Sequence, residues 1–522
     1  MTSAPSRDPD GTSDFSWLRH AGIPLACGAL CVLGFAPLRW FLVPIFSLAI
    51  LFGLWAHCRF YKTAVASGFA FGLGLFLAGA SWVYVSMHVY GAMSAALAAL
   101  ATLLFCGYLA LFPAAAGWLV HRSARSLPFK LTIAGPSSFV LLEWVRSWLF
   151  TGFPWLTLGY TQAPESALAG YAPLLGVFGV SWLLAASGGL VALAWLFRRD
   201  TKWQVKTAVL VMLAVIWVGG LQFKRIGWSD PYGEPVSVAL LQGNVAQDQK
   251  WREEVRAATL EDYRRMALAS DAQLIIFPET ALPLFFDQIP VAYLRELVLH
   301  AQQRGADILL GTVERTSAEG KFDYYNSVIS LGSSRPQVYR KSHLVPFGEF
   351  IPPGFGWVLN ILKIPFTDFA RGDPSQSPLE AAGQRIAVNI CYEDAFGDEI
   401  IRQLPLATLL VNVSNDAWFG DSFAAEQHFQ MSQMRALETS RWMLRATNTG
   451  VSGVIDEKGR EVGRLSQFKT ETLISAMQGR SGLTPYVATG NWPILGVLFV
   501  SMLLSFSAAS MFPGAKMFRT GE

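Results

Sequence analysis

A carboxylate, an ammonium and a thiol each stand at the end of a short apolar run in the middle of this sequence. They belong to Glu279, Lys341 and Cys391. A carboxylate whose pKa is raised by burial can take the proton of a thiol, and a fixed ammonium can stabilise first the thiolate and then the oxyanion of a tetrahedral intermediate. If the three side chains meet in the folded protein, they can carry out nucleophilic catalysis without a histidine.

Each of these residues also has a structural interpretation when it is taken alone. A free cysteine such as Cys391 is often a small core residue, although the other four cysteines lie within long apolar segments and leave it without an obvious disulfide partner. Glu279 could cap a helix after a proline, and Lys341 could be a solvated surface lysine. His343 is a second candidate base, or a turn-stabilising or core histidine, and Asp416 is a candidate for an Asx turn. Their joint occurrence at strand ends favours the chemical interpretation.

The apolar runs that carry these residues recur through the middle of the chain, with polar stretches of helical pattern between them. Strands are expected at 236–242, 274–277, 308–312, 325–331, 337–340, 385–390, 408–413 and 450–455. Helices are expected at 252–269, 291–304 and 424–445. This alternation predicts an α/β domain in which helices cover the faces of sheets.

The composition of the whole chain is that of a membrane protein. Hydrophobic residues make up 52% of the 522 residues and charged residues only 15%, against about a quarter charged in soluble domains. Eight membrane-spanning helices are expected, at 21–38, 41–58, 64–86, 93–120, 131–150, 169–197, 203–222 and 492–512. The first is not interpreted as a signal peptide, because Pro37 makes a poor cleavage site and a second apolar run follows at once.

Basic residues in the short loops predict the orientation of the chain. Twelve Lys and Arg residues fall on one side of the expected spans, and only Arg39 falls in the short loops of the other side. Both termini are therefore expected in the cytoplasm, and the domain before the last span is expected outside it, in the periplasm of a bacterium with two membranes. The predicted organisation is a cytoplasmic segment 1–20, seven helices in 21–223, a catalytic domain 226–488, an eighth helix 490–513 and a cytoplasmic tail 514–522. The small net charge of +3 gives no indication of nucleic-acid binding.

One pair of ionisable residues lies within an expected span. Glu143 and Arg146 are three residues apart, so they share a helix face and are able to pair. Ionisable residues inside a membrane are costly and often functional. The alternative, which we favour, is a structural clamp between helices or an anchor near the outer interface, where Trp144 and Trp148 also lie.

Three short motifs resemble those of the nitrilase, or carbon–nitrogen hydrolase, superfamily, whose catalytic set is Glu-Lys-Cys. They are Phe-Pro-Glu-Thr280, Tyr-Arg-Lys341 and Asn-Ile-Cys-Tyr-Glu393. Longer stretches, at 240–244 with Trp251, 341–349, 414–420 and 445–450, are similar to a membrane-bound branch, the apolipoprotein N-acyltransferases. The resemblance covers nearly the whole chain. It implies a multi-span helical membrane domain of eight helices and an α/β nitrilase-like αββα sandwich.

The resemblance also implies a reaction. Cys391, deprotonated by Glu279, would attack the sn-1 ester of a phospholipid while Lys341 stabilises the oxyanion, and the acyl thioester would pass to the α-amino group of the diacylglyceryl-cysteine of an apolipoprotein. No cofactor or metal is implied. The expected partners are a phospholipid donor, an apolipoprotein acceptor and the bilayer of a bacterial inner membrane. The same resemblance assigns supporting roles to Glu349, Tyr392 and Glu393. It also places Trp251 at the lipid entrance.

Aromatic loops flank the strand ends and add physical support for a lipid substrate. Phe286, Trp357, Trp418 and Phe419 could line an acyl groove or enter the bilayer, or these loops could pack on one another. Two competing functions are a membrane-tethered amidase that uses the same three residues in an open polar pocket, and a lipid transporter with an inert soluble domain. The aromatic loops argue against the first, and the lack of a repeated pattern of intramembrane charges argues against the second.

Overall fold

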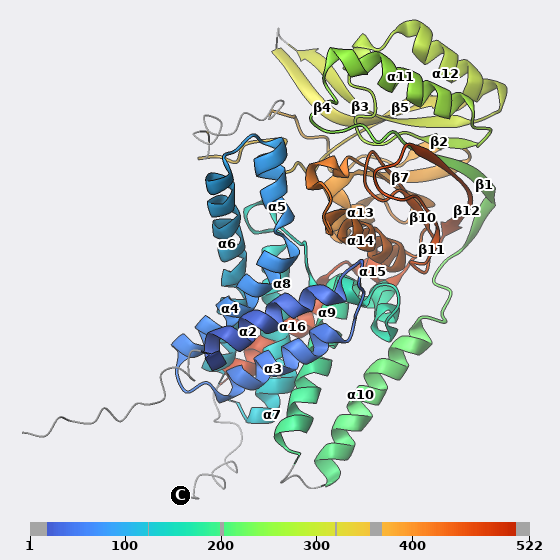
Figure 1. Cartoon of the computed structure of the whole chain (residues 1–522). Helices are drawn as coiled ribbons and strands as arrows, with labels where there is room; N and C mark the ends of the chain where they lie inside the picture. Colours follow the sequence, from blue (N-terminus) through green and yellow to red (C-terminus); the bar gives the residue numbers. More distant parts are fainter. Residues whose placement is uncertain are drawn as a thin grey trace, which may run out of the picture.

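The computed structural model describes residues 18–123, 125–198, 203–318, 321–354, 356 and 368–507. These residues form a helical part and an α/β part, which lie at opposite ends of the molecule (Figure 1). The helices that precede residue 224 and the final helix of the chain make the helical part. The sheets and the helices that cover them make the α/β part.

The helical part contains a helix within each of the eight segments expected to span a membrane. Its helices are α2 (Ile23–Cys31), α3 (Val43–His57), α4 (Tyr61–Gly79), α5 (Trp82–Val85), α6 (Ala95–Arg122), α7 (Leu127–Phe129), α8 (Gly135–Arg146), α9 (Ala172–Leu196), α10 (Trp203–Phe223) and α16 (Trp492–Phe506). Four stretches of the described residues are long and apolar enough to cross a bilayer alone, namely Tyr61–Gly79, Ala95–Arg122, Ala167–Leu196 and Trp203–Phe223. Several apolar helices are therefore present, and the number of eight spans stays a prediction.

Close contact between α2 and α4 depends on two glycines. A Cβ atom at Gly28 would lie 1.9 Å from the main-chain oxygen of Phe71, and a Cβ atom at Gly74 would lie 2.0 Å from that of Leu25. A larger residue at either position would push the two helices apart. Small residues at such contacts are typical of membrane helices, whose association is driven by packing rather than by the hydrophobic effect.

The α/β part contains two six-stranded sheets, in the orders β12-β1-β2-β3-β4-β5 and β11-β10-β9-β8-β7-β6. β1, β2 and β3 are parallel to one another, as are β7, β8 and β9, and the other neighbours are antiparallel. The strands are β1 (Asp230–Gln242), β2 (Leu274–Ile276), β3 (Asp307–Ala318), β4 (Lys321–Gly332), β5 (Gln337–Arg340), β6 (Leu379–Ala381), β7 (Gln384–Ile390), β8 (Leu409–Ser414), β9 (Met443–Thr447), β10 (Gly453–Ile455), β11 (Glu461–Arg464) and β12 (Glu471–Ser481). The helices are α11 (Glu253–Leu268), α12 (Val291–Gln303), α13 (Gly397–Ile400), α14 (Ala424–Thr439) and α15 (Pro485–Thr489).

Successive side chains of a strand point to opposite faces of its sheet, so each sheet packs against different partners on its two faces. Val238 and Leu240 of β1 share a buried core with residues of the second sheet such as Val411. Ala239 and Leu241, which point to the other face of β1, pack in a separate core with α11 and α12. α14 covers the outer face of the second sheet and also packs against α9 of the helical part. The order of helices, sheet, sheet and helices agrees with the predicted sandwich.

The helix expected at 424–445 is wrong at its C-terminal end. α14 ends at Thr439, Ser440 adopts a left-handed conformation with a φ of 51°, and Met443–Thr447 forms strand β9 between β8 and β10. A short apolar run does not by itself distinguish a buried strand from a buried helix. The difference matters because β9 carries Arg445, which the site described below uses.

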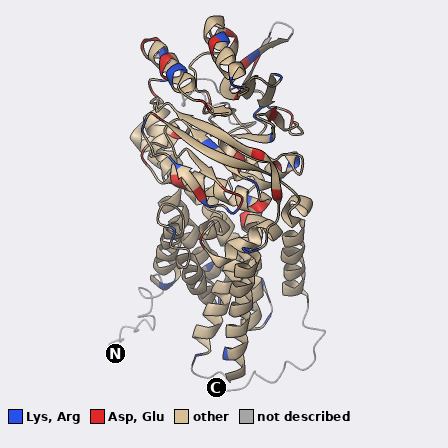
Figure 2. Ribbon diagram, turned by 90° about the vertical axis from the view of Figure 1, so that its right-hand side faces the viewer, with Lys and Arg blue, Asp and Glu red and all other residues tan. Residues whose placement is uncertain are grey.

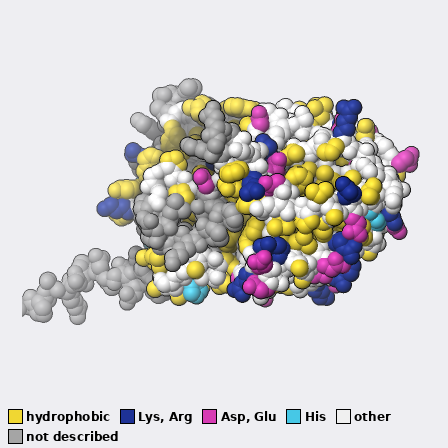
Figure 3. Space-filling model, turned by 90° about the horizontal axis from the view of Figure 1, so that it is seen from above, with side chains coloured by type: hydrophobic (Ala, Val, Ile, Leu, Met, Phe, Trp, Pro, Cys, Tyr) yellow, Lys and Arg dark blue, Asp and Glu magenta, His cyan; other side chains and the backbone are white. Residues whose placement is uncertain are grey.

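Charged side chains are distributed unequally between the two parts. Figure 2 shows acidic and basic residues over the α/β part, including its own helices, and few of them on the helical part. On the face seen from above, charged side chains are interspersed with hydrophobic ones (Figure 3). This distribution is typical of helices surrounded by lipid and of a domain surrounded by water.

Candidate active site

The two sheets bring the ends of β2, β5 and β7 to one place. Glu279 follows β2 after a Phe-Pro dipeptide, whereas Lys341 and Cys391 directly follow β5 and β7. The Nζ atom of Lys341 lies 3.8 Å from Oε1 of Glu279, and both of their charges act on the thiol of Cys391. Glu279 is 7% exposed and Lys341 only 1%. The structure therefore brings together the three side chains that the strand ends predicted.

Both carboxylate oxygens of Glu279 accept hydrogen bonds. Nδ2 of Asn326 on β4 donates to Oε1 over 2.7 Å, and the main-chain N–H of Asn415 after β8 donates to Oε2 over 2.7 Å. The buried ammonium of Lys250 donates to the main-chain oxygen of Glu279 over 3.4 Å. Burial lowers the pKa of Lys250 to about 8. These contacts hold the Glu279 carboxylate in one position, as a base must be held for efficient proton transfer.

Glu349 holds the ammonium of Lys341. Nζ of Lys341 donates to Oε1 of Glu349 over 2.8 Å, and Nδ2 of Asn326 donates to the same oxygen over 2.9 Å. The other oxygen of Glu349 accepts the main-chain N–H of Val345 over 2.8 Å. Burial would lower the pKa of Lys341, but the carboxylates of Glu349 and Glu279 raise it above its ordinary value. Lys341 is therefore a fixed cation at neutral pH.

Glu393 joins the loop after β7 to the loop after β5. Its Oε2 atom accepts the main-chain N–H of Ile390 and the hydroxyl of Tyr339, over 2.7 and 3.0 Å. Its Oε1 atom accepts the main-chain N–H groups of Ser342 and His343, over 2.7 and 3.0 Å. The hydroxyl of Ser342 also donates to Oε1 over 3.0 Å, so one buried carboxylate with five donors keeps the loop that carries the thiol in register with the loop that carries the ammonium.

The main chain at Cys391 has an unusual conformation. Cys391 begins the 3-10 helix Cys391–Ala395 with a φ of 53°, a value that residues other than glycine rarely adopt. Nδ2 of Asn412 and Nε2 of His428 lie 3.1 and 3.2 Å from the main-chain oxygen of Cys391. Strain of this kind is found at functional positions, where surrounding contacts compensate for it.

The thiol of Cys391 needs a base. Burial, followed by the negative charge of Glu279, raises the pKa of Cys391 well above its ordinary value, whereas Lys341 lowers it. The thiol is therefore protonated at neutral pH in the resting site, and only the thiolate is a strong nucleophile. A carboxylate beside the thiol can remove this proton and a cation can stabilise the resulting charge, and Glu279 and Lys341 are groups of these two kinds whose charges act on Cys391.

The pH dependence of Cys391 alkylation should reveal these two opposing charges. Glu279→Gln removes a negative charge beside the thiol and is expected to move the rise in alkylation rate to lower pH. Lys341→Met removes a positive charge and is expected to move it to higher pH. We expect each shift to be about one pH unit or more.

The measurement is the rate of iodoacetamide modification of the peptide that contains Cys391, followed by mass spectrometry as the pH is raised. The exposed Glu296→Gln serves as the control, and shifts of the same sign in both variants would contradict the assignment.

A buried network of charged groups lies next to this loop. His428 of α14 has Nε2 2.8 Å from Asp394 and Nδ1 3.0 Å from Asp416. Arg445 of β9 pairs with the same two carboxylates, over 3.0 and 2.9 Å. Burial and Arg445 lower the pKa of His428, but the two carboxylates raise it overall. Asp416 also accepts the hydroxyl of Ser414 over 2.7 Å. This contact differs from the expected Asx turn, in which the carboxylate would accept a main-chain N–H two residues ahead.

Several residues that contact the site carry no chemical signal in their local sequence. Lys250 and Asn326 lie within stretches without a chemical pattern. Arg445 begins the stretch 445–450, which carries part of the family resemblance, but it lies at the end of an expected helix and is assigned no role. Asn415 has a signal, because it directly follows a strand. His343, the second candidate base, has its ring nitrogens on Glu399 and on the main-chain oxygen of Thr151 and stacks on the ring of Phe396. These partners are distant in the sequence, which fits the core interpretation of His343 rather than the turn-stabilising one.

Two of the aromatic residues predicted to contact lipid pack against the helical part. The ring of Phe419 lies 4.6 Å from that of Trp82 and 5.7 Å from that of Trp155, measured between centroids. The ring of Trp418 lies 6.2 Å from that of Tyr90. These contacts form an aromatic cluster between the loop after β8 and the membrane helices.

The other aromatic candidates lie in different surroundings. Phe286 is partly buried in the core beneath α11 and α12. Trp251 is half-buried in the loop that leads from Lys250 into α11. Trp357 lies outside the described residues.

Glu143 and Arg146 bond the segment that follows α8 instead of forming an ion pair with each other. Oε1 of Glu143 accepts the main-chain N–H of Leu158 over 2.9 Å. Arg146 donates to the main-chain oxygens of Phe153 and Trp155. Arg146 is the last residue of α8, so its guanidinium reaches the carbonyl groups of the chain that folds back beneath it. The structural interpretation, a clamp, therefore fits the contacts: the two side chains hold the loop after α8, and Glu143 also interacts with Ser181 of α9.

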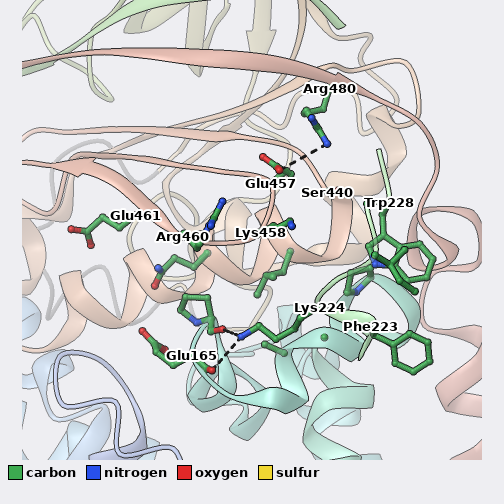
Figure 4. Close-up of a pocket in the computed structure, with 18 of the residues that line it drawn as sticks. Glu165, Phe223, Lys224, Trp228, Ser440, Glu457, Lys458, Arg460, Glu461 and Arg480 are labelled. Carbon is green, nitrogen blue, oxygen red and sulfur yellow. Dashed lines mark hydrogen bonds and ion pairs between the residues drawn. The ribbon is translucent and has the colours of Figure 1, made fainter. Parts of the chain in front are cut away.

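A cavity of about 640 Å³ lies elsewhere, between the end of α10, the start of α9, α14 and the turn after β10. Lys224 donates to the main-chain oxygens of Pro164 and Glu165 at its edge, and Arg480 pairs with Glu457 on the opposite side (Figure 4). Glu279, Lys341 and Cys391 do not line this cavity. It is therefore separate from the candidate active site.

The α/β part has the architecture of a carbon–nitrogen hydrolase domain, and residues 237–486 match the family model described as "Carbon-nitrogen hydrolase". Residues 27–190 match the model described as "Apolipoprotein N-acyltransferase N-terminal domain". The chain belongs to the apolipoprotein N-acyltransferase family, because curated members of that family resemble it over almost their whole length. This confirms the resemblance inferred from the motifs.

Three of these relatives bear the name apolipoprotein N-acyltransferase. The protein from Nitrosomonas europaea is 49% identical, over 93% of this chain and 96% of its own. The protein from Methylococcus capsulatus is 47% identical, over 91% of this chain and 93% of its own. The protein from Ralstonia nicotianae is 42% identical, over 97% of this chain and 98% of its own.

Proposed function

We propose that this protein transfers an acyl chain from a phospholipid to the N-terminal amine of an apolipoprotein. Family membership supports the proposal, and one structural observation carries it: the loop that bears Cys391 is in direct contact with the helical part. The hydroxyl of Tyr160 donates to the main-chain oxygen of Ala395 over 3.1 Å, and the ring of Trp155 stacks on that of Tyr392. A nucleophile placed against membrane helices suits substrates that stay in the bilayer.

The first half of the proposed reaction forms a thioester. Glu279 takes the proton of the Cys391 thiol, and the thiolate attacks the carbonyl carbon of the sn-1 ester. Lys341 stabilises the oxyanion of the tetrahedral intermediate. The intermediate collapses by breaking the bond to the glycerol oxygen, which Glu279 protonates as lysophospholipid leaves. The acyl chain then remains on Cys391.

The second half transfers the acyl chain to an amine. The α-amino group of the diacylglyceryl-cysteine attacks the thioester carbonyl, and Glu279 accepts a proton from the amine. The carbon–sulfur bond breaks, an amide forms, and the Cys391 thiol recovers its proton. A thioester suits this sequence because it divides one difficult transfer into two easier ones. Burial of the site limits competing hydrolysis.

The same proposal assigns the parts of the chain to compartments. Residues 21–223 and 490–513 cross the inner membrane as eight helices, and residues 226–488 work in the periplasm. Both termini lie in the cytoplasm, on the side that collects the basic residues of the short loops.

The experiment that tests the proposal follows the acyl group directly. Purified full-length protein in detergent micelles is incubated with phosphatidylethanolamine that carries a palmitoyl chain at sn-1, and the intact protein mass is measured. We expect a mass increase of one palmitoyl group on the peptide that contains Cys391, released by hydroxylamine. Addition of a synthetic diacylglyceryl lipopeptide should move this group to the peptide amine. Release of free palmitate without an acylated protein or peptide would contradict the proposal.

A further inference from the structure

A strained segment of the main chain, residues 150–160, separates α8 from the loop that bears Cys391. Phe150, Thr151 and Leu156 all adopt positive φ values, of 52°, 76° and 59°. Such a conformation is costly for residues other than glycine and persists only where surrounding contacts hold it. Something in the structure must therefore fix this segment.

Glu143 and Arg146 supply these contacts from inside the helical part. Arg146 donates to the main-chain oxygens of Phe153 and Trp155 and to the hydroxyl of Thr157, the last two over 2.6 and 3.3 Å. Glu143 accepts the main-chain N–H of the next residue, Leu158, over 2.9 Å. The two charged side chains are only 5% and 3% exposed. Burying them is costly, so a chain that needed only an apolar helix at this position would not carry them.

The other side of segment 150–160 contacts the nucleophile loop. The hydroxyl of Tyr392 donates to the main-chain oxygen of Gly152 over 3.1 Å, and the hydroxyl of Tyr160 donates to that of Ala395 over 3.1 Å. The ring of Trp155 stacks on that of Tyr392 with a centroid distance of 6.4 Å and an interplanar angle of 18°. These contacts lie at both ends of the 3-10 helix that begins with Cys391.

The same segment also contacts the loop that carries the ammonium. Nε2 of His343 lies 3.1 Å from the main-chain oxygen of Thr151, and His343 is two residues from Lys341. One piece of the helical part therefore lies against both of the loops that must stay aligned.

We propose that Glu143 and Arg146 are positioning residues for Cys391. They hold segment 150–160 in its strained conformation, and this segment fixes the nucleophile loop relative to Lys341 and Glu279. The membrane helices thus set the reactivity of the thiol in addition to anchoring the domain. This inference rests on the proposed acyl transfer, which it deepens.

The test compares Arg146→Met and Arg146→Lys with the control Arg39→Met in the full-length protein. Arg39 also joins the helical part to α14, but its hydrogen bonds go to Glu165 and Gln433. Acylation of Cys391 by the palmitoyl phospholipid is followed in a single turnover, which gives both a rate constant and a final acylated fraction. We expect the rate constant of Arg146→Met to fall about tenfold to a hundredfold while the acylated fraction and the half-saturating lipid concentration stay unchanged. Arg146→Lys should recover part of the rate, and Arg39→Met should retain it.

A merely structural role would give a different result. It would lower the fraction of protein that becomes acylated, because part of the sample would be misfolded, and leave the rate constant of the remainder unchanged. That outcome, or equal slowing in Arg39→Met, would overturn the proposal.

Tyr160→Phe, which removes one hydroxyl group and little volume, is a second variant that we expect to slow acylation about fivefold.

Amide hydrogen exchange of the peptide 391–396 gives a readout that needs no lipid. Arg146→Met should accelerate this exchange about tenfold and Arg39→Met should not, since only the former releases the segment beneath the loop. Unchanged exchange in Arg146→Met would also overturn the proposal. If the unmodified protein is never acylated by phospholipid, the proposed function fails instead, and the exchange result still decides whether Arg146 positions the loop.

Discussion

Cys391→Ala is expected to abolish acyl transfer to a diacylglyceryl lipopeptide, with a loss of at least about 10⁴-fold. The expectation follows because Cys391 is the only thiol on which both Glu279 and Lys341 act among the described residues. Without it, no thioester forms, and the remaining groups can only bind and polarise the ester. The measurement is the amount of acylated lipopeptide over time, together with the intact mass of the protein.

Two controls separate this effect from a loss of structure. Cys58→Ala removes another partly exposed thiol, in the helical part, and should retain the activity within about twofold, as most substitutions away from a site do. Cys391→Ser keeps the size of the side chain but replaces the thiol with a hydroxyl group that is much harder to deprotonate, so it should be nearly as inactive as the alanine variant. Transfer by Cys391→Ala at a substantial fraction of the original rate would contradict the mechanism.

Lys341→Met is expected to lower the rate of Cys391 acylation by about 10²–10³-fold, the usual effect of removing one donor to an oxyanion. It should also lower the melting temperature, because it leaves the carboxylates of Glu279 and Glu349 buried without their cation. The loss of one member of a buried ion pair costs about 3–5 kcal/mol. A fall in activity alone would therefore not distinguish the loss of oxyanion stabilisation from the loss of protein stability.

The double variant Lys341→Met/Glu349→Gln resolves this ambiguity. Replacing Glu349 removes one unpaired charge while Nδ2 of Asn326 still has an acceptor, so the melting temperature should recover. The rate of acylation should stay as low as in Lys341→Met, because the oxyanion still lacks its cation. Recovery of the acylation rate in the double variant would show that Lys341 has only a structural role.

The residues at the three strand ends could be predicted because their signal is local. An apolar run of strand length followed directly by Lys341 or Cys391 is visible without any knowledge of its neighbours. The contacts of Glu349 with Lys341 agree with the role that the family resemblance implied. β9 could not be predicted with the same method, because its apolar pattern continues that of α14 and its strand conformation depends on pairing with β8 and β10.

The sequence by itself determined which chemical groups are present, where the apolar segments lie and which stretch between them forms the α/β domain. Only the tertiary structure decided which groups meet. Glu393 bonds residues 50 and 51 positions away, and Arg146 bonds a loop rather than the Glu143 carboxylate that helical spacing favours. The physical reason is that hydrogen-bonding and charged groups act over a few ångströms, so their partners are set by how the sheets stack and how the chain folds back, which no local pattern records.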